Sequence, residues 1–265
     1  MGVLNVTPDS FSDGGRHFDE TAAITRGLEL IAEGAGIVDV GGESTRPGAE
    51  PIPPDVELQR VVPVVEALAG EGAVVSIDTS KPTVAEAALV RGVEIVNDVT
   101  AARAPGMADL VAASGAGIVL MHMQGTPRTM QDDPAYDDVV SEVEEYLTQR
   151  LNTVAAAGVS EDRIAIDPGI GFGKTLQHNL ELLRGLDRLS RHGPVVVGTS
   201  RKGFLGALTG IDEPAQRDLA TAVTTALAFA RGARVFRVHD VASSRQALSV
   251  ANAMVAAKAP DGNEL

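Results

Sequence analysis

Two residue types are missing from this chain, and the absence of cysteine excludes whole classes of chemistry. It contains no cysteine and no tryptophan. Without cysteine, neither a disulfide framework nor thiol catalysis is available, which favours a reducing compartment. No apolar run approaches the roughly 20 residues that a membrane-spanning helix needs. The chain also opens directly on an apolar strand and not on a signal peptide. We therefore expect a cytoplasmic protein without a membrane partner.

Basic residues are in the minority. The 22 Lys and Arg residues are outnumbered by 36 Asp and Glu residues, which gives a net charge of −14. Nucleic acids and anionic membranes both require basic surfaces, so neither is an expected partner. In so acidic a chain, any cluster of basic residues is evidence for an anionic ligand.

Short Val- and Ile-rich runs alternate with segments of helical periodicity along the 265 residues. Strands that alternate with helices imply a parallel sheet, because parallel strands need crossover connections. Eight such units in about 250 residues are typical of a (β/α)8 TIM barrel. An open doubly wound sheet is the alternative, disfavoured because no GxGxxG follows the first strand. We expect one α/β domain over residues 1–258 and a C-terminal tail over 259–265. The expected strands are 2–6, 37–40, 74–78, 94–98, 117–122, 163–167, 194–199 and 234–239.

Polar residues stand at or near the end of each expected strand. Asp167 shows the pattern: Pro168 stops the strand, and three glycines then form a loop that can lie close to a ligand. In a barrel all these ends meet on one face, where active sites are built. The alternative is that polar residues simply begin loops; for Asp39 and Ser76, a structural bridge between neighbouring strands is favoured. The strand-end residues are Asn5, Asp39, Asp78, Asn97, His122, Asp167, Ser200, Arg237 and His239.

Cationic groups gather at the same expected face. Ser200 is predicted to cap a helix that begins at residue 201, and this helix N-terminus would point into the mouth. Lys202 is unfavourable in a first helical turn, which indicates another role. Together, these cationic groups predict a phosphate or diphosphate site. They are Lys202, Arg46, Arg237 and His239. The alternative is that these cations pair with Asp78, Asp98 and Asp167.

Two phenylalanines, Phe11 and Phe172, fall in loops at the expected mouth. Exposed aromatic rings in loops suit stacking against a flat ligand. The alternative, which the sequence favours equally, is that each ring packs into the top of the barrel and closes it.

Five blocks of the sequence closely resemble the signatures of bacterial dihydropteroate synthases. In order they are NVTPDSFSDGG at 5–15, GGESTRPG at 41–48, DPGIGFGK at 167–174, SRK at 200–202 and RVHD at 237–240. The resemblance covers essentially the whole chain. The family's usual leader before the first strand is nearly absent, so the barrel floor is expected to lack that cover.

The resemblance implies that (7,8-dihydropterin-6-yl)methyl diphosphate is joined to 4-aminobenzoate in folate synthesis, with loss of diphosphate. Asp167 would accept the paired donors of the pterin edge. Asn97 and Asp78 would satisfy the remaining ring nitrogens, and Lys202 would donate to the ring. Arg237 would stack on the pterin. Val99 and Met121 would line the apolar walls, and Gly198 is a further expected substrate-binding residue.

The diphosphate and the second substrate involve further residues in this resemblance. Thr45, Arg46 and His239 would hold the diphosphate, and Asn5 would be the protein ligand of Mg²⁺. Lys202, Arg237 and His239 would stabilise the departing group. Asp9 would orient the amine or accept its proton. The 4-aminobenzoate pocket would be formed by Phe11, Pro47, Phe172 and Ser200.

Two other functions fit the same fold. A pterin-binding methyltransferase would share the acids at the pterin edge, but it needs no diphosphate site, and Thr45, Arg46, Lys202 and His239 speak against it. A non-catalytic paralogue would bind pterin only. The resemblance also implies a homodimer through the late helices. It makes the chain a sulfonamide target, whether sensitive or resistant.

Overall fold

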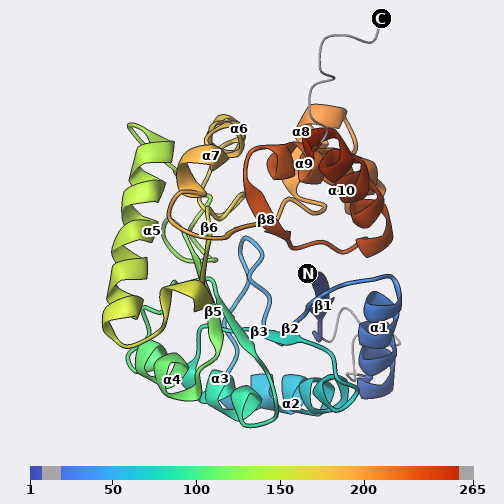
Figure 1. Cartoon of the computed structure of the whole chain (residues 1–265), viewed down its shortest axis with the longest axis vertical. Coiled ribbons are helices and arrows are strands. Elements are labelled where there is room, and N and C mark those ends of the chain that lie inside the picture. The colour runs from blue at the N-terminus through green and yellow to red at the C-terminus, as the bar shows by residue number, and fades with distance from the viewer. Residues whose placement is uncertain (8–18, 257–265) are drawn as a thin grey trace, which may run out of the picture.

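The computed structural model describes residues 1–7 and 19–256. Eight parallel strands form one sheet in sequence order, from β1 to β8. The sheet is strongly curled into a half-barrel, and helices lie around its outside (Figure 1). The expected single α/β domain is thus confirmed, while the predicted tail at 259–265 lies outside the described residues. The strands are β1 (Gly2–Asn5), β2 (Val38–Gly41), β3 (Val75–Asp78), β4 (Ile95–Asp98), β5 (Gly117–Met121), β6 (Ile164–Asp167), β7 (Val195–Val197) and β8 (Ala233–Phe236).

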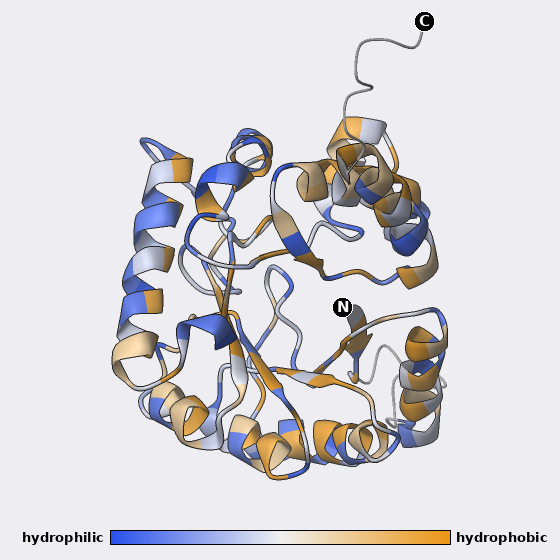
Figure 2. Ribbon diagram, in the orientation of Figure 1, coloured by the Kyte–Doolittle hydropathy of each residue, from blue (hydrophilic) through white to orange (hydrophobic). Residues whose placement is uncertain are grey.

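The strands are built of residues that suit burial on both faces. Hydrophobic colours run along them in Figure 2, and Val40, Ile77 and Val96 are fully buried. Covered parallel sheets characteristically have such continuous apolar strands. The helices around them are α1 (Glu20–Ala32), α2 (Pro54–Gly70), α3 (Pro82–Leu89), α4 (Met107–Ser114), α5 (Val139–Ala156), α6 (Leu176–Arg184), α7 (Leu186–Leu189), α8 (Gly203–Thr209), α9 (Asp218–Ala230) and α10 (Val241–Ala256), with short 3-10 turns η1 (Glu161–Arg163) and η2 (Pro214–Arg217).

The first strand lies beside the segment that follows the last one. The Val3 amide donates to the Val238 carbonyl at 2.9 Å, and the Val238 amide donates to the Met1 carbonyl at 2.9 Å. The Met1 amino group donates to the Phe236 carbonyl at 3.0 Å. These bonds bring the residues after β8 next to β1, although more than 200 residues separate them.

The helical connection between β6 and β7 is interrupted at Gly185, where α6 ends and α7 begins. The helix expected to start at residue 201 begins instead at Gly203, with Lys202 at the N-cap position and no side-chain cap. Ser200 is therefore not a helix cap, because the backbone turns at Arg201, which has a positive φ of 60°.

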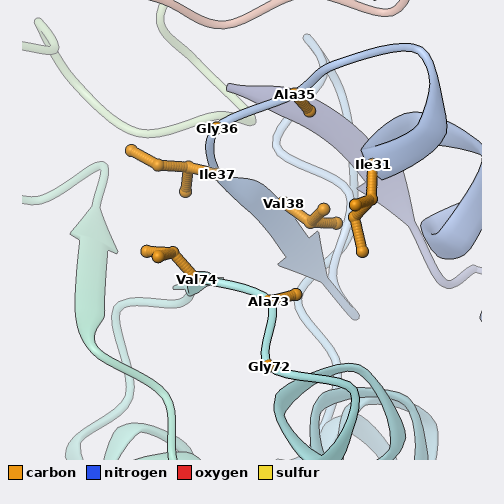
Figure 3. Close-up of a pocket in the computed structure, with 8 residues that line it drawn as sticks. All are labelled: Ile31, Ala35, Gly36, Ile37, Val38, Gly72, Ala73 and Val74. Atoms are coloured by element: carbon orange, nitrogen blue, oxygen red, sulfur yellow. The ribbon is translucent and has the colours of Figure 1, made fainter.

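The opposite end of the strands carries a small apolar hollow. Its volume is about 170 Å³, and it lies where β2 and β3 begin (Figure 3). Since the polar strand ends point the other way, this hollow is not part of the site described next. The residues that line the hollow are Ile31, Ala35, Gly36, Ile37, Val38, Gly72, Ala73 and Val74. Within residues 1–7 and 19–256, no helix is both long and apolar enough to cross a membrane.

Candidate active site

Three predicted site residues lie at the carboxyl ends of the strands, as expected. Asp78 ends β3 and pairs in register with Asn97 of β4, and Asp167 ends β6. Each of the three is only 6% exposed. A buried carboxylate or amide must find a partner, either in the protein or in a ligand. The convergence of distant strand ends on one rim is therefore observed.

Arg237 joins three strands at this rim. Its Nε donates to Asp39 Oδ2 at 2.6 Å, and its Nη2 donates to Asp78 Oδ2 at 2.7 Å. Asn97 Nδ2 donates to the same oxygen of Asp39 at 3.0 Å. Burial by itself would lower the pKa of Arg237, but Asp39 and Asp78 raise it above its ordinary value. Asp39 thus has a structural role, but it joins β2 to β4 and to the segment after β8, not to a neighbouring strand as expected. Ser76 makes no such bridge, because its buried hydroxyl has no hydrogen-bond partner in the described part of the chain.

Asp78 is poised to change its protonation state. Burial raises the pKa of its carboxyl to about 7, while the positive charge of Arg237 opposes that shift. One oxygen of Asp78 and one of Asp39 are buried and have no hydrogen-bond partner in the described part of the chain. An incoming donor would satisfy them, since unpaired buried acceptors are costly.

Asp167 and Lys202 form the second half of the rim. The Gly169 amide donates to Asp167 Oδ1 at 2.7 Å. Burial raises the pKa of Asp167, and the charge of Lys202 is the main opposing influence. Lys202 Nζ donates to the Ile170 carbonyl and lies 4.6 Å from the centroid of the Phe172 ring. Burial lowers the pKa of Lys202 to about 8, against the attraction of Asp167.

An apolar wall and a gap complete this half. Phe172 packs against a small cluster separate from the main core. Gly198 leaves space between the cations: a Cβ there would stand 3.8 Å from both Lys202 Nζ and Arg237 Cβ. A flat ring lying on this wall would face Asp167 and Lys202. The cluster consists of Val99, Met121, Met123 and Met130.

Ser200 and His239 act as a pair. Ser200 Oγ accepts from the His239 amide at 3.1 Å and lies 2.9 Å from His239 Nδ1. Burial, and then the charges of Arg201 and Arg237, lower the pKa of His239 to about 4. The ring is therefore neutral near pH 7. In the tautomer in which the Ser200 hydroxyl donates to Nδ1, Nε2 carries the proton and can donate to a ligand.

The positive pocket predicted from the sequence is accordingly weaker than expected. His239 is neutral, and Arg237 is already paired with Asp78, as the alternative had it, and with Asp39, which the alternative did not name. Lys202 and Arg46 remain as cations. Asp98, the other acid in that alternative, accepts hydrogen bonds from its own loop at Thr100 and Ala102, so its role is structural.

The loop after β2 carries residues that the resemblance implies for the diphosphate. Thr45 is half-buried, whereas Arg46 and Pro47 are exposed. Arg46 is close enough to His239 to contribute to its lowered pKa. Asn5 is half-buried at the end of β1, in register with Gly41 of β2. Asp9 and Phe11 lie outside the described residues.

A buried pair beneath the loop after β6 was not predicted. Lys174 is 3% exposed, and its Nζ lies 3.0 Å from His122 Nδ1 and donates to the Phe172 carbonyl at 2.9 Å. Burial lowers the pKa of Lys174 to about 7 and that of His122 to about 3. His122 thus supports the loop instead of facing a ligand. The position of Lys174 in the DPGIGFGK block was the only signal in the sequence.

A family model described as "Pterin binding enzyme" matches residues 1–239. The chain belongs to the pterin-binding enzyme family. Within that family, a dihydropteroate synthase of Mycobacterium leprae is 52% identical over 96% of this chain and 92% of its own length. The similarity to dihydropteroate synthases read from the sequence blocks is confirmed.

Solved structures of the family agree. Dihydropteroate synthase of Xanthomonas albilineans with 4-aminobenzoic acid has a TM-score of 0.91 and 47% identity, covering 97% of this chain and 93% of that one. The Yersinia pestis enzyme in a sulfonamide drug complex has a TM-score of 0.92 and 40% identity, covering 97% and 94%. Family members of this kind are transferases of folate biosynthesis, and so is this chain.

Proposed function

We propose that this chain condenses (7,8-dihydropterin-6-yl)methyl diphosphate with 4-aminobenzoate, giving 7,8-dihydropteroate and diphosphate. The observation that carries the proposal is the buried Asp167, set between Lys202 and the backbone of Gly169 on the rim that also holds Asn97.

We place the reaction in the cytoplasm, in keeping with the absence of cysteine. We also propose that the curled sheet is a closed (β/α)8 barrel, supported by the backbone hydrogen bonds between Val3 and Val238.

The pterin would be held by its polar edge. Asp167 Oδ2 and the free side of Oδ1 would accept two donors of the amino-pyrimidinone, a paired geometry with charge-assisted strength. Asn97 and the unpaired oxygen of Asp78 would take the remaining ring nitrogens. Lys202 would turn from the Ile170 carbonyl to the pterin carbonyl. Val99, Met121 and Phe172 would cover one face of the ring, while Arg237 would stack on the other.

Departure of the diphosphate would be assisted by groups that need no proton transfer. Lys202 and Arg46 would supply positive charge, Thr45 a hydroxyl and His239 its Nε2–H. As the bond between the methylene carbon and the phosphate oxygen breaks, the ring nitrogens would spread the positive charge left on the carbon. The arylamine nitrogen would then form the new C–N bond, and Asp9 would take its proton. Pro47, Ser200, Phe172 and Phe11 would form its pocket.

We propose Asn5 as the protein ligand of Mg²⁺. Its amide oxygen suits this hard cation, which keeps several waters and binds mainly through substrate phosphates. In residues 1–7 and 19–256, no three His, Cys, Asp or Glu side chains gather into a metal site. A single amide ligand fits that setting better than an all-protein cage. When bound, Mg²⁺ would neutralise charge on the leaving diphosphate. Chelation should abolish turnover, and Asn5→Ala should raise the Mg²⁺ concentration needed for half-maximal rate.

The direct test is release of diphosphate, measured with each substrate omitted in turn. Release that requires both substrates supports the condensation. Release that 4-aminobenzoate does not accelerate, or no release, would refute it. Calorimetry then tests the pterin edge: Asp167→Asn should weaken binding of the pterin diphosphate by about 10- to 100-fold, the value of a charge-assisted hydrogen bond. Asp109→Asn, an exposed position on α4, is the matched control.

We propose a homodimer that covers one face of α9 and α10. Leu219, Val223 and Leu227 recur every four residues on α9 and are each more than half exposed. Val250 and Met254 on the neighbouring α10 are exposed as well. Apolar faces of this kind mark interaction surfaces. Sedimentation should give twice the chain mass, and the pair Leu219→Glu with Leu227→Glu should give monomers. A wild-type monomer at micromolar concentration would exclude this interface.

A further inference from the structure

A cluster of three charged side chains lies behind the loop that follows β2. Lys81, at the N-cap of α3, contacts Glu43 Oε2 at 3.0 Å and also contacts Glu57 Oε2. Glu57 projects from α2 and is completely buried. The cluster thus links three separate elements: the β2 loop, α2 and the start of α3. No hydrogen bond or ion pair joins the three side chains to Asp78, Asn97 or Asp167 in the described part of the chain, although the charge of Glu57 helps to raise the pKa of Asp78.

Glu43 uses its second oxygen to hold the loop closed at its base. Glu43 Oε1 accepts from the Ile52 amide at 2.7 Å, which fastens the end of the loop to its beginning. Arg60 Nη1 donates to the Gly42 carbonyl at 2.8 Å, and this bond fixes Gly42, the residue just before Glu43. The enclosed segment, residues 44–51, contains Thr45, Arg46 and Pro47. Its tip is attached where the Gly48 amide donates to the Pro127 carbonyl at 3.0 Å, and Glu50 forms an exposed ion pair with Arg128 at 3.8 Å.

Lys81 is the residue on which the charge balance of this cluster depends. One ammonium serves two carboxylates, and the other oxygen of Glu57 has no hydrogen-bond partner in the described part of the chain. Removing Lys81 would leave Glu43 and Glu57 as neighbouring, partly desolvated charges that repel each other. Glu57 has no freedom to move because it is buried in a helix. Glu43 lies in a loop, so it would be the group that shifts, and the loop base would shift with it.

We propose that Lys81 is a positioning residue: through Glu43 it sets the loop carrying Thr45, Arg46 and Pro47, and so controls capture of 4-aminobenzoate and of the diphosphate. The inference rests on the proposed function for its substrates. Lys81 touches neither substrate. Its effect is confined to the side of the site formed by this loop, whereas the pterin edge at Asp167 and Asn97 is held by other contacts.

The variant that tests this must remove the anchor without leaving a buried charge. Lys81→Met with Glu57→Gln does so, since both replacements preserve approximate volume and the buried carboxylate becomes neutral. Glu57→Gln alone is the matched control, because it keeps the Lys81–Glu43 contact. In the double variant, the KM for 4-aminobenzoate should rise about tenfold, as expected when one ordering ionic contact is lost. Binding of 6-hydroxymethylpterin, which lacks the diphosphate, should stay within about twofold of its value in the Glu57→Gln control by calorimetry. That control carries any effect of the Glu57 charge on Asp78.

Amide hydrogen exchange gives a readout that does not depend on activity. Peptides covering residues 44–52 should exchange faster in the double variant and remain unchanged in Glu57→Gln. Equal exchange in this segment would overturn the proposal, even in a protein without diphosphate release. An unchanged KM with a lowered melting temperature would also overturn it, by showing that the cluster serves folding only. A wild-type chain without diphosphate release, but with the exchange difference, would refute the proposed function and leave the anchor standing.

Discussion

The Arg237 guanidinium donates to Asp39 at 2.6 Å, although 198 residues separate the two in sequence. Asp39 is fully buried and accepts from Asn97 with the same oxygen. One carboxylate of β2 therefore orients a residue of β4 and a residue beyond β8. Arg237 keeps its charge in this setting because Asp39 and Asp78 outweigh the effect of burial on its pKa.

The substitution Asp39→Asn should weaken the pterin side of the site. The asparagine side chain keeps the size of the aspartate but lacks the charge that orients Arg237 and Asn97. The affinity for the pterin diphosphate should fall by about 10- to 100-fold, the range for a hydrogen bond to a charged group. Calorimetry measures this affinity in the wild type and the variant, and the change in KM for 4-aminobenzoate is compared with it. An equal loss on both substrates would mean that Asp39 supports the fold and not the pterin site.

The rate should fall in alkaline solution because Lys202 loses its proton there. Burial lowers the pKa of Lys202 to about 8, so the ammonium is present below that pH and lost above it. The profile of kcat/KM, which reports the free enzyme, should therefore decline as pH rises through about 8. Lys202→Arg should remove this decline, at some cost in rate, since arginine stays charged. A decline that persists in the variant would belong to another group, such as Lys174.

The turn before Lys202 should depend on Asp218. Arg201 has a positive φ of 60°, unfavourable for a residue with a side chain. Its guanidinium is held by Asp218 through two hydrogen bonds, at 2.8 and 2.7 Å. Asp218→Asn should lower the free energy of unfolding by about 1–3 kcal/mol, measured in urea, and should lower kcat because Lys202 loses its fixed direction. Asp187→Asn on α7 serves as control. An unchanged kcat would separate this turn from catalysis.

Gly169 should tolerate no side chain. Its φ is +66°, and a Cβ there would collide with the carbonyl oxygen of His122. Gly169→Ala should cost more than about 3 kcal/mol, combining the backbone strain with a clash against main chain. Gly48→Ala has φ +79° but open space around it, so it should cost only about 1 kcal/mol. Thermal unfolding of the two variants, side by side, checks this, and similar losses would contradict the steric explanation.

The sequence by itself determined the order of strands and helices, and it marked Asp78, Asn97 and Asp167 as polar residues at one rim. That information is local: apolar runs, helical periodicity, and a polar residue where each strand stops. It also carried the likeness of whole blocks to known enzymes. It predicted a helix cap at Ser200 wrongly, because Thr199 to Lys202 contains a turn fixed by Thr221 and Asp218 from another helix.

Only the tertiary structure decided which charges meet. The partnership of Arg237 with Asp39, the support of Lys174 by His122, and the shared ammonium of Lys81 all join residues far apart in sequence. Curling the sheet brings such side chains within 3 Å and out of water at once. There, burial and a neighbouring charge set the protonation of each group, which spacing along the chain does not encode.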